Sequence, residues 1–203
     1  MLVTLSTLLN DLNIAPNSEE ADRAERSLEA ATDWVEKYLD RPIQYEEGRE
    51  EKVQGYGWPE INLRLFPIDS VEKVEVDGSE ETEFEVYSDK GTLYLESGWP
   101  PARVNRGKYT QYGAARSGRR NVTVTYSGGY VTPGQADGEF SNKETTLPGD
   151  IQEAALLVAS TMYQQAGSHG RVRRGHVLRA GTWFEQEEYQ ATIEGLIGHY
   201  RDL

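Results

Sequence analysis

The segment LPGDIQEAALLVASTMYQQ, residues 147–165, is the most apolar stretch of helical length in the chain. Pro148 fits a first helical position, where its missing N–H needs no partner, and Asp150 faces the positive end of the helix dipole. One helical face is marked by apolar residues at the required spacing, Ile151, Ala154, Ala155, Val158 and Met162.

The opposite side of this predicted helix is also apolar, with Leu156, Leu157 and Ala159. No Asp, Glu, Lys or Arg occurs between Glu153 and Arg171. A helix that is apolar nearly all round is usually buried on more than one side. We therefore expect the rest of the chain to pack against it, and part of it to face a neighbouring subunit.

Two further helices are predicted before this one and one after it. Residues 3–12 place four leucines on one side, and residues 17–40 form an amphipathic helix whose start resembles a capping box, Asn17 with Glu20. This helix ends before Arg41-Pro42, as a following proline requires. The last helix is predicted over Thr182–Tyr200.

The middle of the chain has the alternating pattern of short strands. Residues 43–45 are expected to begin a strand, 46–51 to be charged and exposed, and Asn121–Tyr126 to alternate as a strand. Asp77-Gly78 signals a turn, and residues 132–146 are expected to form a polar surface loop.

The predicted fold class is therefore α+β and mainly helical. It has N-terminal helices, a small antiparallel β region and two C-terminal helices. We expect one domain over residues 1–203, with helices at 1–40, a β region at 43–130 that contains a basic loop at 101–120, and helices at 147–203 that contain a basic loop at 167–181. No window approaches the roughly 18 consecutive apolar residues of a membrane helix.

The charge balance is acidic and poor in lysine. Asp and Glu total 34 against 21 Lys and Arg, which gives a net charge of −13. Carboxylates hold water, and salt screens their mutual repulsion, so this surface suits a halophilic source. An ordinary acidic protein is the other interpretation that the composition leaves open.

Two segments reverse this charge. Residues 101–120 contain six basic residues and no acidic one, and residues 167–181 contain four Arg and two His with no acidic residue. Such segments meet nucleic acid or an acidic protein surface, or remain solvated loops without a partner. Tyr109 and Tyr112 lie among the cations of the first segment, a pattern that also allows stacking on single-stranded nucleic acid.

Signatures of enzymes are mostly absent from the sequence. There is no cysteine, no nucleophile elbow, no H-E-x-x-H, no Walker loop and no G-x-G-x-x-G. The three histidines, His169, His176 and His199, lack metal-ligand spacing, and the carboxylates show no pair that stands out from a solvated acidic face. We expect no catalytic residue, no cofactor and no metal.

The order of four motifs resembles one protein family. EKYLDRPI (36–43) is followed by LRLFPIDSVEKVEVDG (63–78), VTVTYSGGY (122–130) and LPGDIQEAALLVASTMY (147–163). Over residues 17–165 this order resembles the head–tail connector (adaptor) family of long-tailed phages and related viruses.

The resemblance implies a structural virion protein rather than an enzyme. Its subunits would form a twelve-membered ring in the neck, between the portal and the tail, with assembly in the host cytoplasm and no membrane. The ring would extend the channel for double-stranded genomic DNA and offer a docking platform to the next neck or tail protein.

Within this interpretation, two sets of residues are candidates for contact. The basic loops are expected to contact the portal or DNA, through Arg103, Arg106, Lys108, Arg116, Arg119, Arg120, Arg171, Arg173, Arg174 and Arg179. The last helix would be a second docking element, with Trp183 and Phe184 as anchors because aromatic residues often dominate interfaces.

Three alternatives remain open from the sequence. The chain could form another ring of the neck, such as a stopper or tail-completion protein. It could be a halophilic nucleic-acid-binding protein that uses the same loops, which predicts salt-sensitive DNA affinity. A hydrolase with paired carboxylates would need a pocket with convergent acids.

Overall fold

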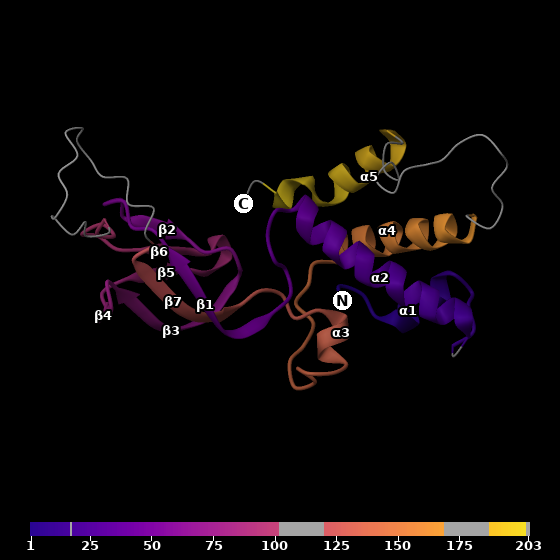
Figure 1. Ribbon diagram of the computed structural model, residues 1–203, viewed down its shortest axis with the longest axis horizontal. Coiled ribbons are helices and arrows are strands. Elements are labelled where there is room, and N and C mark those ends of the chain that lie inside the picture. Colours follow the sequence, from indigo (N-terminus) through magenta and orange to yellow (C-terminus); the bar gives the residue numbers. More distant parts are fainter. Residues whose placement is uncertain (17, 102–119, 169–186, 202–203) are drawn as a thin grey trace, which may run out of the picture. The chain divides into compact units, whose positions relative to one another are not determined.

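The computed structural model describes residues 1–16, 18–101, 120–168 and 187–201, and Figure 1 shows the order of their elements. The contacts divide the chain into two compact units, Met1–Gln44 with Val131–Leu203, and Tyr45–Tyr130. The first unit holds the helices and the second holds the strands. The α+β class is confirmed, with helices on both sides of the β region in sequence. That the whole chain acts as one domain stays a prediction.

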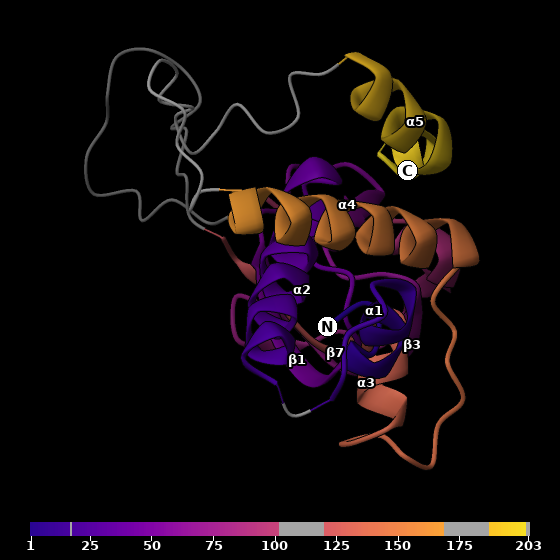
Figure 2. The ribbon, with the colours of Figure 1, turned by 90° about the vertical axis from the view of Figure 1, so that its right-hand side faces the viewer.

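The helical unit is built from α1 (Leu5–Asp11), α2 (Glu19–Tyr38), α3 (Pro133–Ala136), α4 (Gly149–Ser168) and α5 (Glu187–Ile197), followed by the short 3₁₀ helix η2 (Gly198–Tyr200). Helix α4 packs against α2 and α5, and Figure 2 shows α4 lying across α2. The guanidinium of Arg23 on α2 lies over the ring of Tyr163 on α4, 4.3 Å from its centre.

The segment 147–165 forms the central helix, as the sequence predicted. Five apolar residues of α4 are buried, Ile151, Ala154, Ala155, Val158 and Ala159. Leu156 and Leu157 are only half-buried, so the second apolar side of the helix is not fully covered within one chain, and Met162 at the end of the first face is also half-buried. The helix starts one residue later than predicted, because the Pro148 carbonyl accepts from Ile151 N and Gln152 N and so caps the helix from outside.

Two other sequence predictions in the helical unit need correction. The N-cap of α2 is Ser18, whose hydroxyl accepts from Ala21 N at 3.2 Å, so the capping box of Asn17 with Glu20 is wrong by one residue. Within 132–146, residues 133–136 form the one-turn helix α3. Thr132 and Gln135 make the reciprocal bonds of a capping box, which satisfy the backbone groups of so short a helix.

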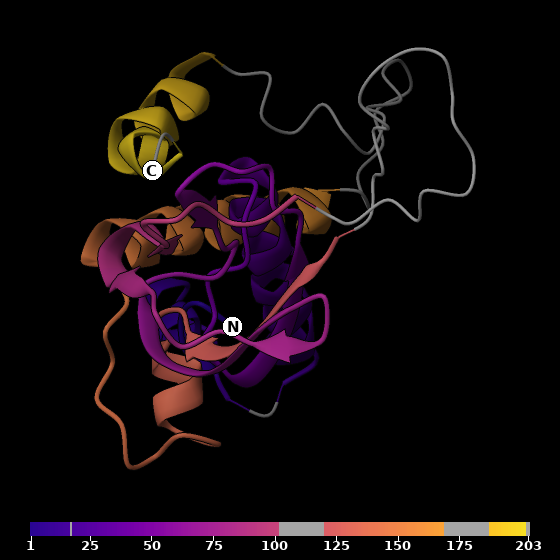
Figure 3. The same cartoon turned by 90° about the vertical axis from the view of Figure 1, so that its left-hand side faces the viewer.

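The β unit contains two small antiparallel sheets. The first has the order β1-β7-β3-β4, from β1 (Glu46–Val53), β3 (Ile68–Val76), β4 (Ser79–Glu80) and β7 (Val122–Gly128). The second has the order β2-β6-β5, from β2 (Glu60–Asn62), β5 (Glu85–Tyr87) and β6 (Thr92–Tyr94), with the 3₁₀ turn η1 (Ser88–Lys90) between β5 and β6. Figure 3 shows these strands from the side of the β unit.

One buried cluster joins the two sheets. The inward residues of both contribute to it, among them Ile61, Leu93, Trp99, Val124 and Tyr126. A buried core can form from so few short strands because each sheet covers the apolar face of the other.

A polar contact also ties the first sheet to the connection between β2 and β3. The hydroxyl of buried Tyr126 donates to Glu51 Oε2 at 2.7 Å and accepts from Leu65 N at 3.2 Å. The same carboxylate accepts from Arg64 N. Burial, and then the bond to the Glu51 carboxylate, raise the pKa of Tyr126, so its hydroxyl stays protonated.

A strand was predicted to begin at residues 43–45, and this is wrong, whereas the charged segment 46–51 is mostly exposed, as predicted. Strand β1 begins at Glu46 and pairs with β7, whereas Gln44 makes only an isolated bridge. An edge strand keeps one side solvated, so a run of carboxylates is tolerated there and also blocks pairing with other chains. The Asp77-Gly78 turn is confirmed, with φ of 52° and 84° at its two residues.

Candidate partner-binding surface

The two ends of the basic segment 101–120 are held together by one buried amide. Asn121, which precedes β7, accepts from Gly55 N through Oδ1 at 3.0 Å and donates through Nδ2 to the Pro100 carbonyl at 2.9 Å. Its own carbonyl accepts from Asp77 N at 2.8 Å. The segment therefore leaves and re-enters the β unit at a fixed base, whatever its own course.

A loop at residues 54–59 is clamped beside this base. Gly57 N donates to the Trp99 carbonyl and Trp99 N donates to the Trp58 carbonyl, each at 2.8 Å. A side chain at Gly55 would place its Cβ 2.3 Å from the Pro100 carbonyl oxygen, so only glycine allows this approach.

This loop presents two aromatic side chains to solvent. Tyr56 is 66% exposed and Trp58 is 72% exposed, and both are among the most exposed large apolar side chains in the described part of the chain. By contrast, Trp99 is completely buried and its indole N–H donates to the Leu93 carbonyl at 3.2 Å. Trp99 therefore stabilises the fold, whereas Trp58 is held by its backbone and left available for a partner.

Aromatic residues presented on a fixed backbone are typical interface anchors, because little conformational entropy is lost when they bind. Asn121, Gly55 and the pair Tyr56 and Trp58 together define the surface that we call the aromatic base of the basic segment. The sequence signal for this surface is the stretch GYGWP at residues 55–59, in which each aromatic residue follows a glycine and no strand periodicity is present.

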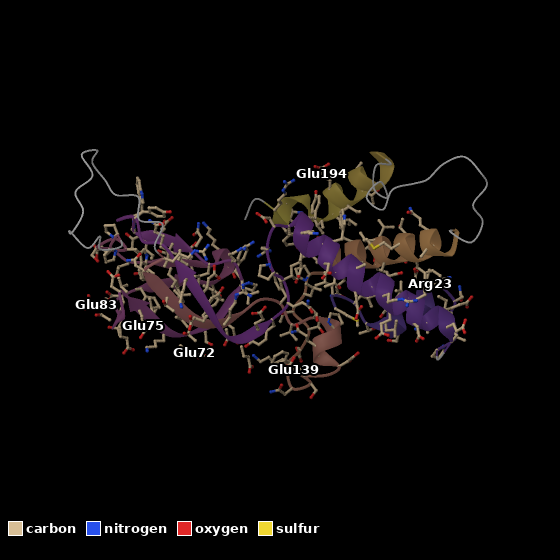
Figure 4. The ribbon with its side chains drawn as sticks, in the orientation of Figure 1. Arg23, Glu72, Glu75, Glu83, Glu139 and Glu194 are labelled. Carbon is tan, nitrogen blue, oxygen red and sulfur yellow. The ribbon has the colours of Figure 1, made fainter. Side chains whose placement is uncertain are left out.

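The body of the β unit has the opposite charge to the basic segment. Between residues 45 and 100 there are 15 acidic residues and five basic ones. Glu72, Glu75 and Glu83 project from the β3–β4 side, as labelled in Figure 4. Several cations here are paired locally, for example Lys73 with Glu75 at 2.6 Å.

Of the predicted contact residues, the structure describes only Arg120, and its side chain is exposed at the aromatic base. The other eleven lie outside the described residues, in 102–119 and 169–186: Arg103, Arg106, Lys108, Arg116, Arg119, Arg171, Arg173, Arg174, Arg179, Trp183 and Phe184. Their roles stay predictions. The sequence interpretation missed Tyr56 and Trp58, which the structure adds as aromatic candidates.

The described residues offer little for chemistry. Within them, no group of three or more His, Asp or Glu side chains could hold a metal ion. His199, in η2, is exposed and its ring lies 4.0 Å from that of Tyr200; the other two histidines are outside the described residues. In the same part of the chain, no helix is both long and apolar enough to cross a membrane.

Comparisons with known proteins give similarity in structure alone. No protein-family model and no curated protein sequence matches the chain. Among solved structures, a chain from the neck of an empty GTA particle, computed with C6 symmetry, is 13% identical with a TM-score of 0.60, over 98% of this chain and 89% of that one.

Two related structures agree. A chain from the neck of a native GTA particle, computed with C12 symmetry, is 13% identical with a TM-score of 0.55, over 98% of this chain and 88% of that one. A chain from the virion of a native gene transfer agent (GTA) particle is 14% identical with a TM-score of 0.53, over 96% and 89%. These similarities establish that the chain shares their fold along nearly its whole length.

Proposed function

We propose that this protein is a structural subunit of the neck of a tailed virus or virus-like particle. The observation that supports this most is the shared fold over 96–98% of the chain with chains from neck and virion structures of gene transfer agent particles. Two of those necks were computed with C12 and C6 symmetry, which accords with a ring of identical subunits.

More specifically, we propose the adaptor ring between portal and tail. Twelve copies would extend the channel for genomic DNA and provide the platform for the next neck or tail protein. The half-buried side of α4, with Leu156 and Leu157, would contact the neighbouring subunit, because apolar residues without full cover in one chain gain from burial in a ring.

The basic segments would then contact the portal or DNA. In the first segment these contacts would come from Arg103, Arg106, Lys108, Arg116, Arg119 and Arg120. In the second they would come from Arg171, Arg173, Arg174 and Arg179, with Trp183 and Phe184 as anchors. Tyr56 and Trp58 would contact the same partner as the first segment, because they flank its base.

Charge reversal tests this assignment. One variant changes Arg116, Arg119 and Arg120 to Glu, and a second changes Arg171, Arg173 and Arg174 to Glu. Each should weaken attachment to the portal and retention of DNA in assembled particles. If both variants attach and retain DNA normally, the assignment of these loops is wrong.

The matched control reverses cations elsewhere in the β unit. Lys52 and Lys73 are exposed on the β1-β7-β3-β4 sheet, where each pairs with a nearby glutamate. The double variant Lys52→Glu and Lys73→Glu also makes the chain more acidic, by two charge reversals against three in each basic-segment variant, without touching either basic segment. It should attach normally.

A nucleic-acid-binding protein is the second candidate, and the two basic segments are the observation that favours it. It predicts that the isolated full-length chain binds double-stranded DNA, with an affinity that falls steeply between about 50 and 200 mM salt. The adaptor proposal predicts little binding by the isolated chain, because its acidic body repels phosphate.

A further inference from the structure

The outer face of the small sheet β2-β6-β5 is hollowed into an open depression of about 520 Å³. Its lining includes Glu60 from β2, Tyr94 and Thr92 from β6, Tyr87 from β5, and Asp89 and Lys90 from the turn η1. This depression lies on the face opposite the buried cluster of the β unit, to which Ile61 and Leu93 belong.

The strand register explains why these side chains gather. Tyr94 pairs with both Glu60 and Glu85, and Thr92 pairs with Tyr87, so all of them share one face of the antiparallel sheet. The rings of Tyr87 and Tyr94 are diagonal neighbours with centroids 6.1 Å apart and an interplanar angle of 63°. Tyr87 is 44% exposed, so part of its ring is open to a ligand.

Carboxylates surround these rings. Glu60 and Asp89 line the depression, and Glu85 accepts a hydrogen bond from the Tyr87 hydroxyl at 3.2 Å. That bond raises the pKa of Tyr87, which keeps the phenol neutral. Lys90 is the cation among the residues that line the depression, so its surroundings are negative overall.

The hairpin that forms the depression is held in place from behind. The Ser88 hydroxyl donates to the Ile68 carbonyl on β3, and the Gly91 carbonyl accepts from Leu63 N at 2.8 Å. Gly91 has a φ of 65°, and a Cβ there would lie 2.9 Å from Phe66, so the turn needs glycine. The site is therefore formed before any ligand arrives.

We propose that this depression binds an arginine side chain of a partner protein. A guanidinium is planar, so it can lie on a tyrosine ring while its N–H groups reach two carboxylates at once. Lysine offers a point charge without a flat face, and an apolar ligand would leave the carboxylates desolvated without compensation. The site does not depend on the neck role, since it needs only an exposed arginine on the partner.

The test uses the full-length protein and three short blocked peptides, Gly-Arg-Gly and its lysine and citrulline counterparts. Citrulline keeps the planar shape of arginine and removes its charge. Binding is followed by NMR chemical-shift changes at the backbone amides of residues 85–94. We expect the arginine peptide to bind about threefold or more tightly than the lysine peptide, and the citrulline peptide not to bind measurably.

Variants of the lining should move the affinity in opposite directions. Tyr87→Ala and Glu60→Gln should each weaken binding of the arginine peptide about threefold or more, whereas Lys90→Gln should strengthen it, because a like charge is removed. Glu139→Gln, an exposed carboxylate of the helical unit, is the matched control and should change nothing.

Several results would overturn the proposal. Equal affinity for the arginine and lysine peptides would show that the depression attracts any positive charge and does not recognise the guanidinium. Shifts confined to amides other than that of Glu60 and those of residues 85–94, or no shifts at millimolar peptide, would show that the peptide does not bind in this depression. The three substituted residues, Tyr87, Glu60 and Lys90, are exposed, so each variant should keep the melting curve of the wild type by circular dichroism. An unchanged curve shows that a loss of binding is not a loss of fold.

Discussion

Replacing Asn121 by alanine should destabilise the β unit strongly, because this one amide joins three separate parts of the chain. The change removes the acceptor for Gly55 N, at 3.0 Å, and the donor to the Pro100 carbonyl, at 2.9 Å. The Gly55 amide is buried, so its N–H would be left without a partner. The bond from Asp77 N to the carbonyl of residue 121 would remain, because it is made by the backbone.

The expected loss follows from these two bonds. A buried donor left unsatisfied costs about 1–3 kcal/mol, and loss of an ordinary hydrogen bond costs about 1 kcal/mol. Together they predict a decrease of roughly 2–4 kcal/mol in the free energy of unfolding. That is a large fraction of the roughly 5–15 kcal/mol that stabilises a typical domain.

Urea unfolding of the full-length chain, followed by Trp fluorescence and circular dichroism, measures this loss. Asn62→Ala is the matched control, since Asn62 is exposed and its amide oxygen only accepts from the Thr92 hydroxyl at 2.9 Å. It should cost less than about 1 kcal/mol. If Asn121→Ala costs no more than Asn62→Ala, then Asn121 does not hold the base of the basic segment and our reasoning about that surface is refuted.

Four further predictions concern the core, the surface and the charge. Tyr126→Phe should cost about 1–3 kcal/mol, because Leu65 N and Glu51 lose their shared partner. The pKa of Tyr126 is raised in the folded state, so the contribution of its hydroxyl to the free energy of unfolding is fully present below the unfolded pKa of about 10 and is lost as the pH rises above that value. Urea midpoints between pH 8 and 11 should therefore fall less steeply in Tyr126→Phe than in the wild type. Ile151→Ala, at a fully buried position of α4, should lower the free energy of unfolding by about 2–5 kcal/mol in the same assay, and a loss below 1 kcal/mol would contradict the central packing of this helix. Trp58→Ala should leave the urea midpoint unchanged and weaken attachment to a partner, whereas the opposite pattern would mean that Trp58 serves the fold. Because salt at about 1 M shortens the screening length to roughly 3 Å, the midpoint for thermal unfolding should rise between 0.1 and 2 M KCl, and a constant or falling midpoint would argue against halophilic adaptation.

Much of the fold could be predicted because its elements carry local signals. The apolar face of α4 and the stripe of α2 at Ala21, Ala24 and Leu28 are periodic, and these residues are buried as expected. Asp77-Gly78 forms its turn because both residues must have positive φ, which few other pairs tolerate. Signals of this kind depend only on neighbouring residues.

The errors arise where distant contacts decide. Strand β1 reads as a solvated charged run, and only its pairing with β7, more than 70 residues later, makes Glu46–Val53 a strand. The division into two sheets likewise depends on which short strands pair with each other, and the hydrophobic periodicity of the sequence does not specify that pairing. Helix α3 was missed because its capping box, Thr132 with Gln135, stabilises a helix of only four residues.

The candidate surface was found only in part. Charge alone located the basic segment 101–120, since a run of cations in an acidic chain is visible in composition. The role of Asn121 was not visible, because both of its partners, Gly55 and Pro100, are brought to it by the fold. The exposure of Trp58 against the complete burial of Trp99 could not be predicted either, as both follow glycine and precede proline.

Sedimentation of the purified full-length chain in molar KCl, alone and mixed with the portal protein from the same genome, tests the proposed role in the neck most directly. We predict that the chain sediments with the portal as an added ring of subunits. A monomer that ignores the portal and instead shifts labelled double-stranded DNA would contradict the adaptor proposal and favour the nucleic-acid-binding one.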